Sequence, residues 1–313
     1  MSTPAPGVAS VAMLAILGPT AAGKSALGLQ LADRLGGEIV CCDSMQVYRG
    51  MDIGTGKPTA EEQRLVPHHL LDLVNPDESF HAAAWAERAR KAIAASTGRG
   101  RLPIVVGGTG LYFRALVAGL FEAPPSDPAI RARHEEEARA LGTPALHARL
   151  QQIDPVAAAR IMPNDLLRIS RALEVFEQTG VPLTALQRAA VAPGDLRPFT
   201  IVLEPSLDEL RVAIDQRVDA MMAAGFLDEV ARLRAAGFGA TRALAGLGYR
   251  QLGMHLDGAL ARSAAVSETK RVTVAYARRQ RTWFRKERAD LRATSAVDAA
   301  SLSDTIAARL ELR

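Results

Sequence analysis

One eight-residue run limits the folds open to this chain more than any other feature. It reads Gly18-Pro19-Thr20-Ala21-Ala22-Gly23-Lys24-Ser25 and directly follows an apolar segment, residues 11–17. This is a complete G-x-x-x-x-G-K-S pattern, which predicts a strand, a phosphate-binding loop (P-loop) and a helix in that order. The alternative is a glycine-rich turn without a ligand. A complete motif between a strand and a helix disfavours that alternative.

The residue types of this run suit a bound phosphate or diphosphate. Gly18 and Gly23 permit the tight turn and leave room for a phosphate against bare backbone. The amides of residues 21–25 and the positive end of the following helix then act as donors. Lys24 adds a charge, and Ser25 offers a hydroxyl for Mg²⁺. The loop therefore predicts the class of ligand but not the reaction.

Length and composition are those of an ordinary globular protein. The chain has 313 residues, 48% hydrophobic and 23% charged, which suits one or two domains. No apolar run approaches the ~20 residues of a membrane span, and residues 1–10 lack the basic start of a leader. We therefore expect a cytoplasmic protein without a membrane segment. Cys41 and Cys42 are adjacent in a strand-like segment, which favours buried thiols over a disulfide or a zinc site.

Charge is distributed unevenly along the chain. The formal net charge is only +4, yet residues 266–292 hold nine basic and three acidic side chains. A local basic helix suits a phosphate-rich partner, and a solvated helix face is the alternative. Residues 114–198, by contrast, hold ten basic and ten acidic side chains and are neutral.

Strand and helix patterns alternate along most of the chain. Apolar runs predict strands at 11–17, 38–42, 70–74, 103–106 and 199–203, with helices at 24–35 and 79–95 between them. Between 114 and 198 helical spacing replaces the strand pattern, and three or four helices follow residue 203. We predict an α/β fold, a P-loop NTPase-like parallel sheet core of residues 1–113 and 199–313 that includes a helical C-terminal part. An all-helical insertion, residues 114–198, interrupts that core.

Two further segments are expected at the carboxyl edge of the sheet, where ligands bind in open α/β folds. Asp43 follows the strand 38–42, and its carboxylate is placed to face the P-loop and take a proton from a second substrate. A helix cap or turn residue is the alternative role for Asp43. The turn 107–110 follows the strand 103–106 and could shape a channel. His68 and His69 have no third ligand at metal spacing, so we interpret them as polar or packing residues.

Short motifs in a fixed order give the chain a specific resemblance. They are Gly-Pro-Thr-Ala-Ala-Gly-Lys-Ser (18–25), Asp-Ser-Met-Gln-Val-Tyr (43–48), Gly-Met-Asp-Ile-Gly-Thr (50–55), Pro-His-His-Leu (67–70), Gly-Gly-Thr-Gly-Leu-Tyr (107–112), Pro-Asn-Asp (163–165) with Arg-Ala-Leu-Glu-Val (171–175), Gln-Arg-Val-Asp (216–219), Gly-Tyr-Arg-Gln (248–251) and Arg-Arg-Gln-Arg-Thr-Trp (278–283). Together they resemble the bacterial tRNA dimethylallyltransferases, also called tRNA isopentenyltransferases. The resemblance covers residues 14–288. Ala22, Gly56 and Met162 depart from the family's usual Ser, Ala and His, and none of them removes a candidate catalytic group.

The resemblance implies a reaction. A dimethylallyl group would pass from dimethylallyl diphosphate to N6 of the adenosine 3′-adjacent to the anticodon, position 37, in tRNAs reading codons that begin with U. The implied partners are the tRNA anticodon stem-loop and dimethylallyl diphosphate, with Mg²⁺ as cofactor and a monomeric enzyme. A P-loop small-molecule or nucleotide kinase is the main alternative. A free-AMP isopentenyltransferase and a nucleotide-dependent RNA-binding module are two others, although the helical insertion and the basic helix favour a macromolecular acceptor.

The resemblance also assigns roles to residues. Asp43 would be the general base, and Lys24, Arg217 and Thr20 would act on the diphosphate, which the whole run 18–25 would bind with a metal on Ser25. Arg217 could instead be a surface residue of an ordinary helix, and Thr20 and Thr109 could simply be packing residues. The candidates for tRNA contact are Asp43, Ser44, Met45, Gln46, Thr109, Arg131, Leu167, Arg168, Ile169, Ser170, Arg171, Gly248, Tyr249 and Arg250.

Overall fold

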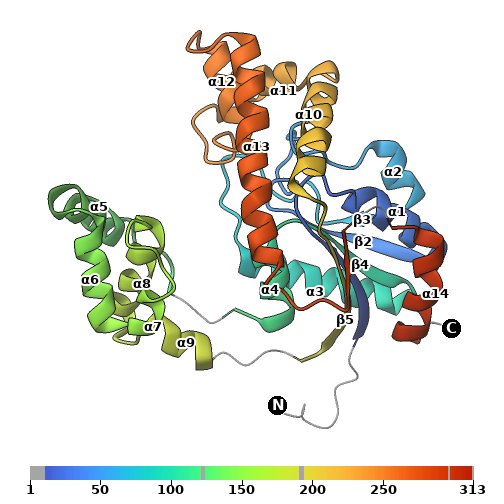
Figure 1. Ribbon diagram of the computed structural model, residues 1–313, viewed down its shortest axis with the longest axis horizontal. Coiled ribbons are helices and arrows are strands. Elements are labelled where there is room, and N and C mark those ends of the chain that lie inside the picture. The colour runs from blue at the N-terminus through green and yellow to red at the C-terminus, as the bar shows by residue number, and fades with distance from the viewer. Residues whose placement is uncertain (1–10, 121–123, 190–193, 295–296, 312–313) are drawn as a thin grey trace. The chain divides into compact units, whose positions relative to one another are not determined.

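The computed structural model describes residues 11–120, 124–189, 194–294 and 297–311. They belong to two compact units, a core unit of residues 1–117 and 194–313 and a helical unit of residues 118–193 (Figure 1). The predicted insertion, 114–198, is a few residues wider at each end. The difference arises because helix α4 (Gly110–Ala118) continues past residue 114 and strand β5 (Leu196–Leu203) begins before residue 199.

A parallel sheet lies at the centre of the core unit. Its strand order is β3-β2-β4-β1-β5-β6, and every pair of neighbours is parallel. The strands are β1 (Val11–Leu17), β2 (Gly37–Cys42), β3 (His68–His69), β4 (Leu102–Gly107), β5 and β6 (Leu291–Ala293). All residues of β2 and β4 are buried, as expected for strands covered on both faces. The predicted α/β class with a parallel sheet is confirmed.

Two strands differ from the prediction. The third strand was expected at residues 70–74, but β3 comprises only His68–His69. Leu70 and Asp72 have φ values of 68° and 53°, and this left-handed backbone cannot continue an extended strand. A single bridge between Tyr48 and Val74 is all that remains of the expected pairing there. The sequence also gave no signal for β6, which is three residues long and borders β5.

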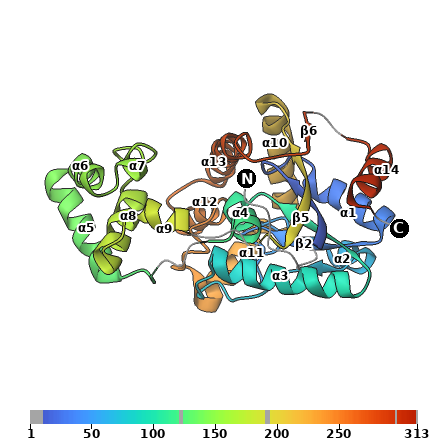
Figure 2. The same ribbon diagram turned by 90° about the horizontal axis from the view of Figure 1, so that it is seen from below.

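Helices cover both faces of the sheet (Figure 2). Alternate residues of β1 face opposite sides. Leu14 and Ile16 join the cluster that contains α1 (Lys24–Leu35) and α14 (Ala299–Leu310). Met13 and Leu17 join the cluster beneath α3 (Ala82–Gly98) and α4. Beyond these layers the core unit also contains α2 (Ala60–Leu65), α10 (Leu207–Ala223), α11 (Phe226–Leu233), a π-helical turn (Arg234–Phe238), α12 (Tyr249–Leu256) and α13 (Arg262–Phe284).

The helical unit has a hydrophobic core of its own. It consists of α5 (Pro128–Leu141), α6 (Thr143–Ile153), α7 (Pro155–Ala158), α8 (Leu166–Thr179) and α9 (Leu183–Ala189). Leu146 and Leu150 of α6 pack against Ile169 and Leu173 of α8. Within the helical pattern predicted between 114 and 198, Gly142, with a φ of 83°, ends α5 and separates it from α6. Among the described residues, no helix of either unit is both long enough and apolar enough to span a membrane.

Candidate active site

The P-loop joins the end of β1 to the start of α1 at the carboxyl edge of the sheet. Gly18 has a φ of 150°, and a Cβ there would lie 2.6 Å from the carbonyl oxygen of Leu203, so the position requires glycine. Gly23, with a φ of 84°, precedes the first helical residue, Lys24. The first N–H groups of α1 have no partner within the helix and face the loop, which is the arrangement that binds phosphate.

Three charged groups from distant parts of the chain act on one another at this edge. Lys24 Nζ donates to the carbonyl oxygen of Pro19 at 2.6 Å. Burial and the nearby charge of Arg217 lower the pKa of Lys24 to about 8, while the charge of Asp43 opposes this shift. Burial also lowers the pKa of Arg217, again opposed by Asp43. The three charged residues predicted to be catalytic are thus brought together.

The carboxylate of Asp43 is fixed by a turn at the end of β2. Its Oδ1 accepts hydrogen bonds from the backbone N–H groups of Met45 at 2.8 Å and Gln46 at 3.4 Å. Such an Asx turn holds the side chain against its own backbone. The alternative reading of Asp43 as a turn residue is therefore correct as far as Oδ1 is concerned. Oδ2 makes neither of these bonds.

The end of β4 lies beside this turn because β2 and β4 are neighbours in the sheet. Thr109 donates its backbone N–H to the carbonyl oxygen of Cys42 at 3.2 Å. Its hydroxyl oxygen accepts from the backbone N–H of Ser44 at 3.0 Å and lies 3.4 Å from Ser44 Oγ. The structure thus joins the predicted residues Asp43, Ser44 and Thr109 into one cluster.

The loop 51–57 connects this cluster to Arg217. Gln46 donates its side-chain amide to the carbonyl oxygens of Thr55 and Gly56, at 3.4 and 3.0 Å. Arg217 donates to the same Thr55 carbonyl at 3.4 Å. Gln46, predicted to contact the RNA, and Arg217, predicted to act on the diphosphate, therefore donate to the same segment of backbone.

A buried carboxylate holds the first half of this loop. Glu229 accepts from the backbone N–H groups of Asp52, Ile53 and Gly54 at 3.0, 2.7 and 3.1 Å. It also accepts from the hydroxyl of Tyr249 at 2.6 Å. All four donors are neutral groups, and together they supply the hydrogen bonds without which burial of the Glu229 carboxylate would be costly.

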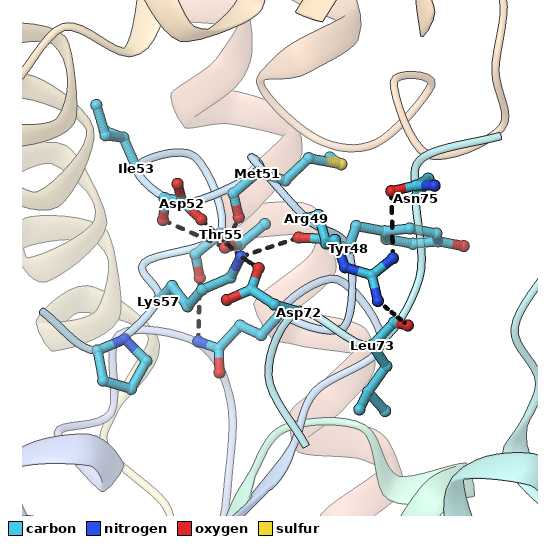
Figure 3. A network of polar contacts seen from close by, with 12 residues as sticks. Tyr48, Arg49, Met51, Asp52, Ile53, Thr55, Lys57, Asp72, Leu73 and Asn75 are labelled. Carbon is cyan, nitrogen blue, oxygen red and sulfur yellow. Dashed lines mark hydrogen bonds and ion pairs between the residues drawn. The ribbon is translucent and has the colours of Figure 1, made fainter. Parts of the chain in front are cut away.

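Lys57 fastens the other end of the loop, as Figure 3 shows. Its ammonium donates to the backbone oxygen of Tyr48 at 2.9 Å and to carboxylate oxygens of Asp52 and Asp72, each at 2.6 Å. The Lys57 side chain is only 4% exposed, and its charge is compensated by these two carboxylates, which are themselves about half exposed. Thr55 adds a bond from its hydroxyl to the carbonyl oxygen of Met51 at 2.6 Å.

The comparisons with known proteins decide the family. The family model described as IPP transferase matches residues 46–287, more than half of the chain. The curated tRNA dimethylallyltransferase of Anaeromyxobacter dehalogenans (strain 2CP-1 / ATCC BAA-258) is 51% identical over 88% of this chain and 90% of the relative. The chain belongs to the tRNA dimethylallyltransferase family.

Two solved structures of tRNA dimethylallyltransferases extend this result to the fold. The full-length tRNA isopentenylpyrophosphate transferase of Bacillus halodurans matches with a TM-score of 0.68 and 38% identity, over 96% of this chain and 97% of that one. A eukaryotic dimethylallyltransferase acting on tRNA matches with a TM-score of 0.74 and 26% identity, over 96% of this chain and 77% of that one. Membership of this family makes the chain a prenyl-transferring enzyme and disfavours the kinase alternative.

Four of the residues predicted to contact tRNA from the resemblance to tRNA dimethylallyltransferases are buried, Gly248 among them. The Tyr249 side chain is 2% exposed and bonds Glu229, so it supports the loop 51–57 and has no surface to offer RNA. Ile169 lies in the core of the helical unit, and Ser170 is buried beside His134 with its hydroxyl 3.0 Å from Nδ1. The helical stripe of α8 could have indicated this, because Ile169 falls on its apolar face.

Apart from these buried residues, the predicted tRNA contacts have accessible positions in one unit or the other. In the helical unit Leu167 is 68% exposed on the first turn of α8, next to the exposed Arg168. Arg131 and Arg171 are tied to the buried carboxylate of Glu174, at 3.6 and 2.8 Å. In the core unit Arg250 is exposed on α12, directly after Gly248 and Tyr249. Their contact with RNA remains a prediction for this tRNA dimethylallyltransferase.

Sequence reasoning missed several residues that shape the site. Glu229 accepts from backbone N–H groups of the loop 51–57, and Lys57 donates to a backbone oxygen and two carboxylates, so no periodicity indicates either residue. Tyr276 of α13 lies close enough to Asp43 for that charge to act on it; burial mainly, and Asp43 next, raise its pKa to about 12. The predicted burial of Cys41 and Cys42 is confirmed, and His69 serves as a polar partner of Glu38, with Nε2 and Oε2 2.7 Å apart.

Proposed function

We propose that this chain transfers the dimethylallyl group of dimethylallyl diphosphate to N6 of the adenosine 3′-adjacent to the anticodon, position 37. The acceptors are tRNAs that read codons beginning with U, and the products are N6-(dimethylallyl)adenosine and diphosphate. One observation carries the proposal more than any other: Asp43, whose Oδ1 is fixed by a turn, lies near enough to Lys24 and Arg217 at the P-loop for their charges to act on one another. This arrangement supplies a base for the acceptor and positive charge for the leaving group.

Asp43 acts on the acceptor. The lone pair of adenine N6 is delocalised into the ring, so the amine is a weak nucleophile and gains from proton removal as it attacks. Oδ1 of Asp43 is engaged by the turn, and we assign the N6 proton to Oδ2. Thr109, Ser44 and the Gln46 amide surround the place where the base would lie. A loop adenosine must leave its stack to enter such a site.

Lys24 and Arg217 act on the leaving group. As the N6–carbon bond forms, the allylic C–O bond breaks and the diphosphate departs with the bonding electrons. The negative charge that gathers on the diphosphate is stabilised by the two cations and by the N–H groups of the P-loop. We place Thr20 in this loop as a further contact to the diphosphate.

Mg²⁺ is proposed as the cofactor, held by Ser25. This residue lines a cavity of about 90 Å³ together with Gln46, Lys57, Glu62 and His68. A hydroxyl oxygen next to a bound diphosphate fits Mg²⁺, which prefers oxygen ligands and accepts few of them from the protein. When bound, the ion would neutralise charge on the diphosphate.

The macromolecular partner is proposed to be the anticodon stem-loop of tRNA. Exposed arginines of α13, Arg278 and Arg279 among them, and Arg285 directly after this helix supply the positive surface that a nucleic-acid backbone requires. Because tRNA is a cytoplasmic substrate in bacteria, we place the reaction in the cytoplasm. We also propose that one chain suffices, since all three charged catalytic candidates come from the same core unit.

A direct assay tests the proposed reaction. Purified protein is incubated with labelled dimethylallyl diphosphate, Mg²⁺ and an unmodified anticodon stem-loop, without any nucleoside triphosphate. We expect label in the RNA, and none when adenosine 37 is replaced by guanosine or when AMP is the acceptor. A strict requirement for ATP with release of ADP would instead establish a kinase, and binding without label transfer would establish an RNA-binding module.

A further inference from the structure

One side chain of α13 bridges the two glycine loops of the candidate site. Gln280 is 7% exposed. Its Oε1 accepts the backbone N–H of Thr20, in the P-loop, at 2.8 Å. Its Nε2 donates to the carbonyl oxygen of Gly108, in the turn after β4, at 2.9 Å. Thr20 belongs to the proposed diphosphate loop, and Gly108 precedes Thr109, a proposed contact of the acceptor base.

The two partners determine what Gln280 must be. Thr20 offers a backbone donor and Gly108 a backbone acceptor, so the bridging side chain needs an acceptor and a donor at once. Of the side chains of this length, a carboxamide provides both at every pH, whereas a carboxyl group provides both only when it is protonated. An apolar residue of the same size would leave a buried N–H and a buried C=O without partners. The backbone chemistry also fixes which end of the amide is oxygen.

The close packing of Gln280 against Gly108 supports a specific role for this contact. A Cβ at residue 108 would lie 2.6 Å from Gln280 Nε2, so glycine makes the space that the amide occupies. Gly108 is followed by Thr109, which bonds Ser44 beside Asp43. A short chain of contacts therefore runs from the P-loop through Gln280 to the cluster that contains the proposed base.

We propose that Gln280 is a positioning residue, which sets the P-loop against the turn 107–110 and so fixes the distance between the allylic carbon and the acceptor nitrogen. This inference rests on the proposed function. Gln280 need not touch either substrate, because each loop binds its own ligand with its own groups. Its contribution lies in the relative placement of the two loops, and a misplacement of about 1 Å can cost about 10²-fold in rate.

The proposal is tested with two variants and a matched control. Gln280→Met keeps the size and loses both hydrogen bonds. Gln280→Glu keeps the acceptor, but when ionised it has no donor for Gly108. Thr273→Val, the control, removes a hydroxyl of the same helix that bonds only a carbonyl of that helix. For each protein one measures the thermal midpoint, kcat with the anticodon stem-loop, and the Kd values of inorganic diphosphate and of the stem-loop.

We expect Gln280→Met to lower kcat about 10- to 100-fold while both Kd values change less than about threefold. Gln280→Glu should regain activity relative to the original protein as the pH falls from 8 to 6. A protonated carboxyl group has one acceptor and one donor and restores both bonds. The ratio of the variant's kcat to that of the original protein is taken at each pH, because this ratio cancels the titration of groups that both proteins share. This pH dependence requires a folded protein only and remains informative if the Met variant unfolds.

The outcomes that overturn the inference are distinct from those that overturn the proposed function. Near-normal kcat in Gln280→Met, or a Glu variant whose relative activity does not rise at low pH, would reduce Gln280 to a packing residue. Loss of kcat equal to that in Thr273→Val would do the same. Absence of transfer by the unaltered protein would refute the proposed function itself, and the positioning role with it.

Discussion

Replacing Asp43 by Asn separates the two roles that the structure gives this side chain. Oδ1 accepts the backbone N–H groups of Met45 and Gln46, and the amide oxygen of Asn can accept the same bonds. The turn should therefore persist. What disappears is the negative charge and the basic oxygen proposed to take the N6 proton.

The expected size of the effect follows from these contacts. Loss of a positioned general base lowers the rate about 10²- to 10⁴-fold, equivalent to about 3 to 5 kcal/mol in the activation barrier. Because both turn bonds are kept, the free energy of unfolding should change by less than about 1 kcal/mol. Asp43 also raises the pKa of Lys24 against the effects of burial and Arg217. Its loss lowers that pKa further, so the comparison is made at pH 7 or below, where Lys24 of the original protein is charged.

The assay is single-turnover transfer to the anticodon stem-loop at saturating dimethylallyl diphosphate, with thermal unfolding measured in parallel. Asp33→Asn, an exposed carboxylate on α1, is the matched control and should leave the rate unchanged. A near-normal single-turnover rate in Asp43→Asn would remove this carboxylate from proton transfer. Departure of the diphosphate would then be the only step that the protein has to assist.

Three further predictions concern charge at the site and around it. The Lys24 amine has a pKa of about 8 and is charged below that pH. The Kd of inorganic diphosphate should therefore rise above pH 8, by up to about tenfold per pH unit, and calorimetry should detect proton uptake on binding. A Kd that does not change with pH would contradict the lowered pKa of Lys24. Replacing Arg278, Arg281 and Arg285 together by Glu should weaken stem-loop binding and flatten its dependence on salt, while the Kd of diphosphate stays unchanged. Equal RNA affinity in this variant would mean that these arginines are solvated and do not contact RNA. Glu229→Gln places an amide N–H among three backbone N–H donors. Denaturant titration should therefore show a loss of about 1 to 3 kcal/mol in the free energy of unfolding. Unchanged stability would mean that the loop 51–57 does not depend on this carboxylate.

The sequence predicted the parts of the fold that follow from local periodicity and turn chemistry. The P-loop lies between β1 and α1 as expected, and Gly36, with a φ of 62°, ends α1 at the predicted place. The third strand was misplaced because the apolar residues of 70–74 suggest a strand, whereas Leu70 and Asp72 adopt left-handed backbone. Asp tolerates this backbone, but a leucine rarely adopts it, so the sequence around Leu70 does not indicate the break. The three residues of β6 are too few to show any period.

For the candidate site, too, local sequence patterns predicted some residues and missed those that depend on tertiary contacts. Lys24 was found from the P-loop motif, and Asp43 and the turn that contains Thr109 were placed at the site because each follows a strand and parallel strands end at one edge. Arg217 came from the resemblance to a family. Glu229 was missed because its first-turn position on α11 is usual for exposed acidic residues, whereas here the carboxylate is buried against a loop from far away in the chain. Tyr249 was assigned to RNA because a motif locates a residue without saying which way its side chain points.

The position of β1 in the sheet has a consequence for synthesis on the ribosome. Leu17, its last residue, pairs with Gly107 on one side and with Val202 on the other. While translation passes through the helical unit, β1 has acquired its first neighbour but its other edge is bare, and a buried hydrophobic strand with an open edge readily pairs with the wrong chain. The helical unit can fold during this interval because its core is its own. The P-loop is completed only when Leu203, whose carbonyl oxygen packs against Gly18, has emerged. The first functional motif to be translated is thus among the last parts of the nascent chain to take shape.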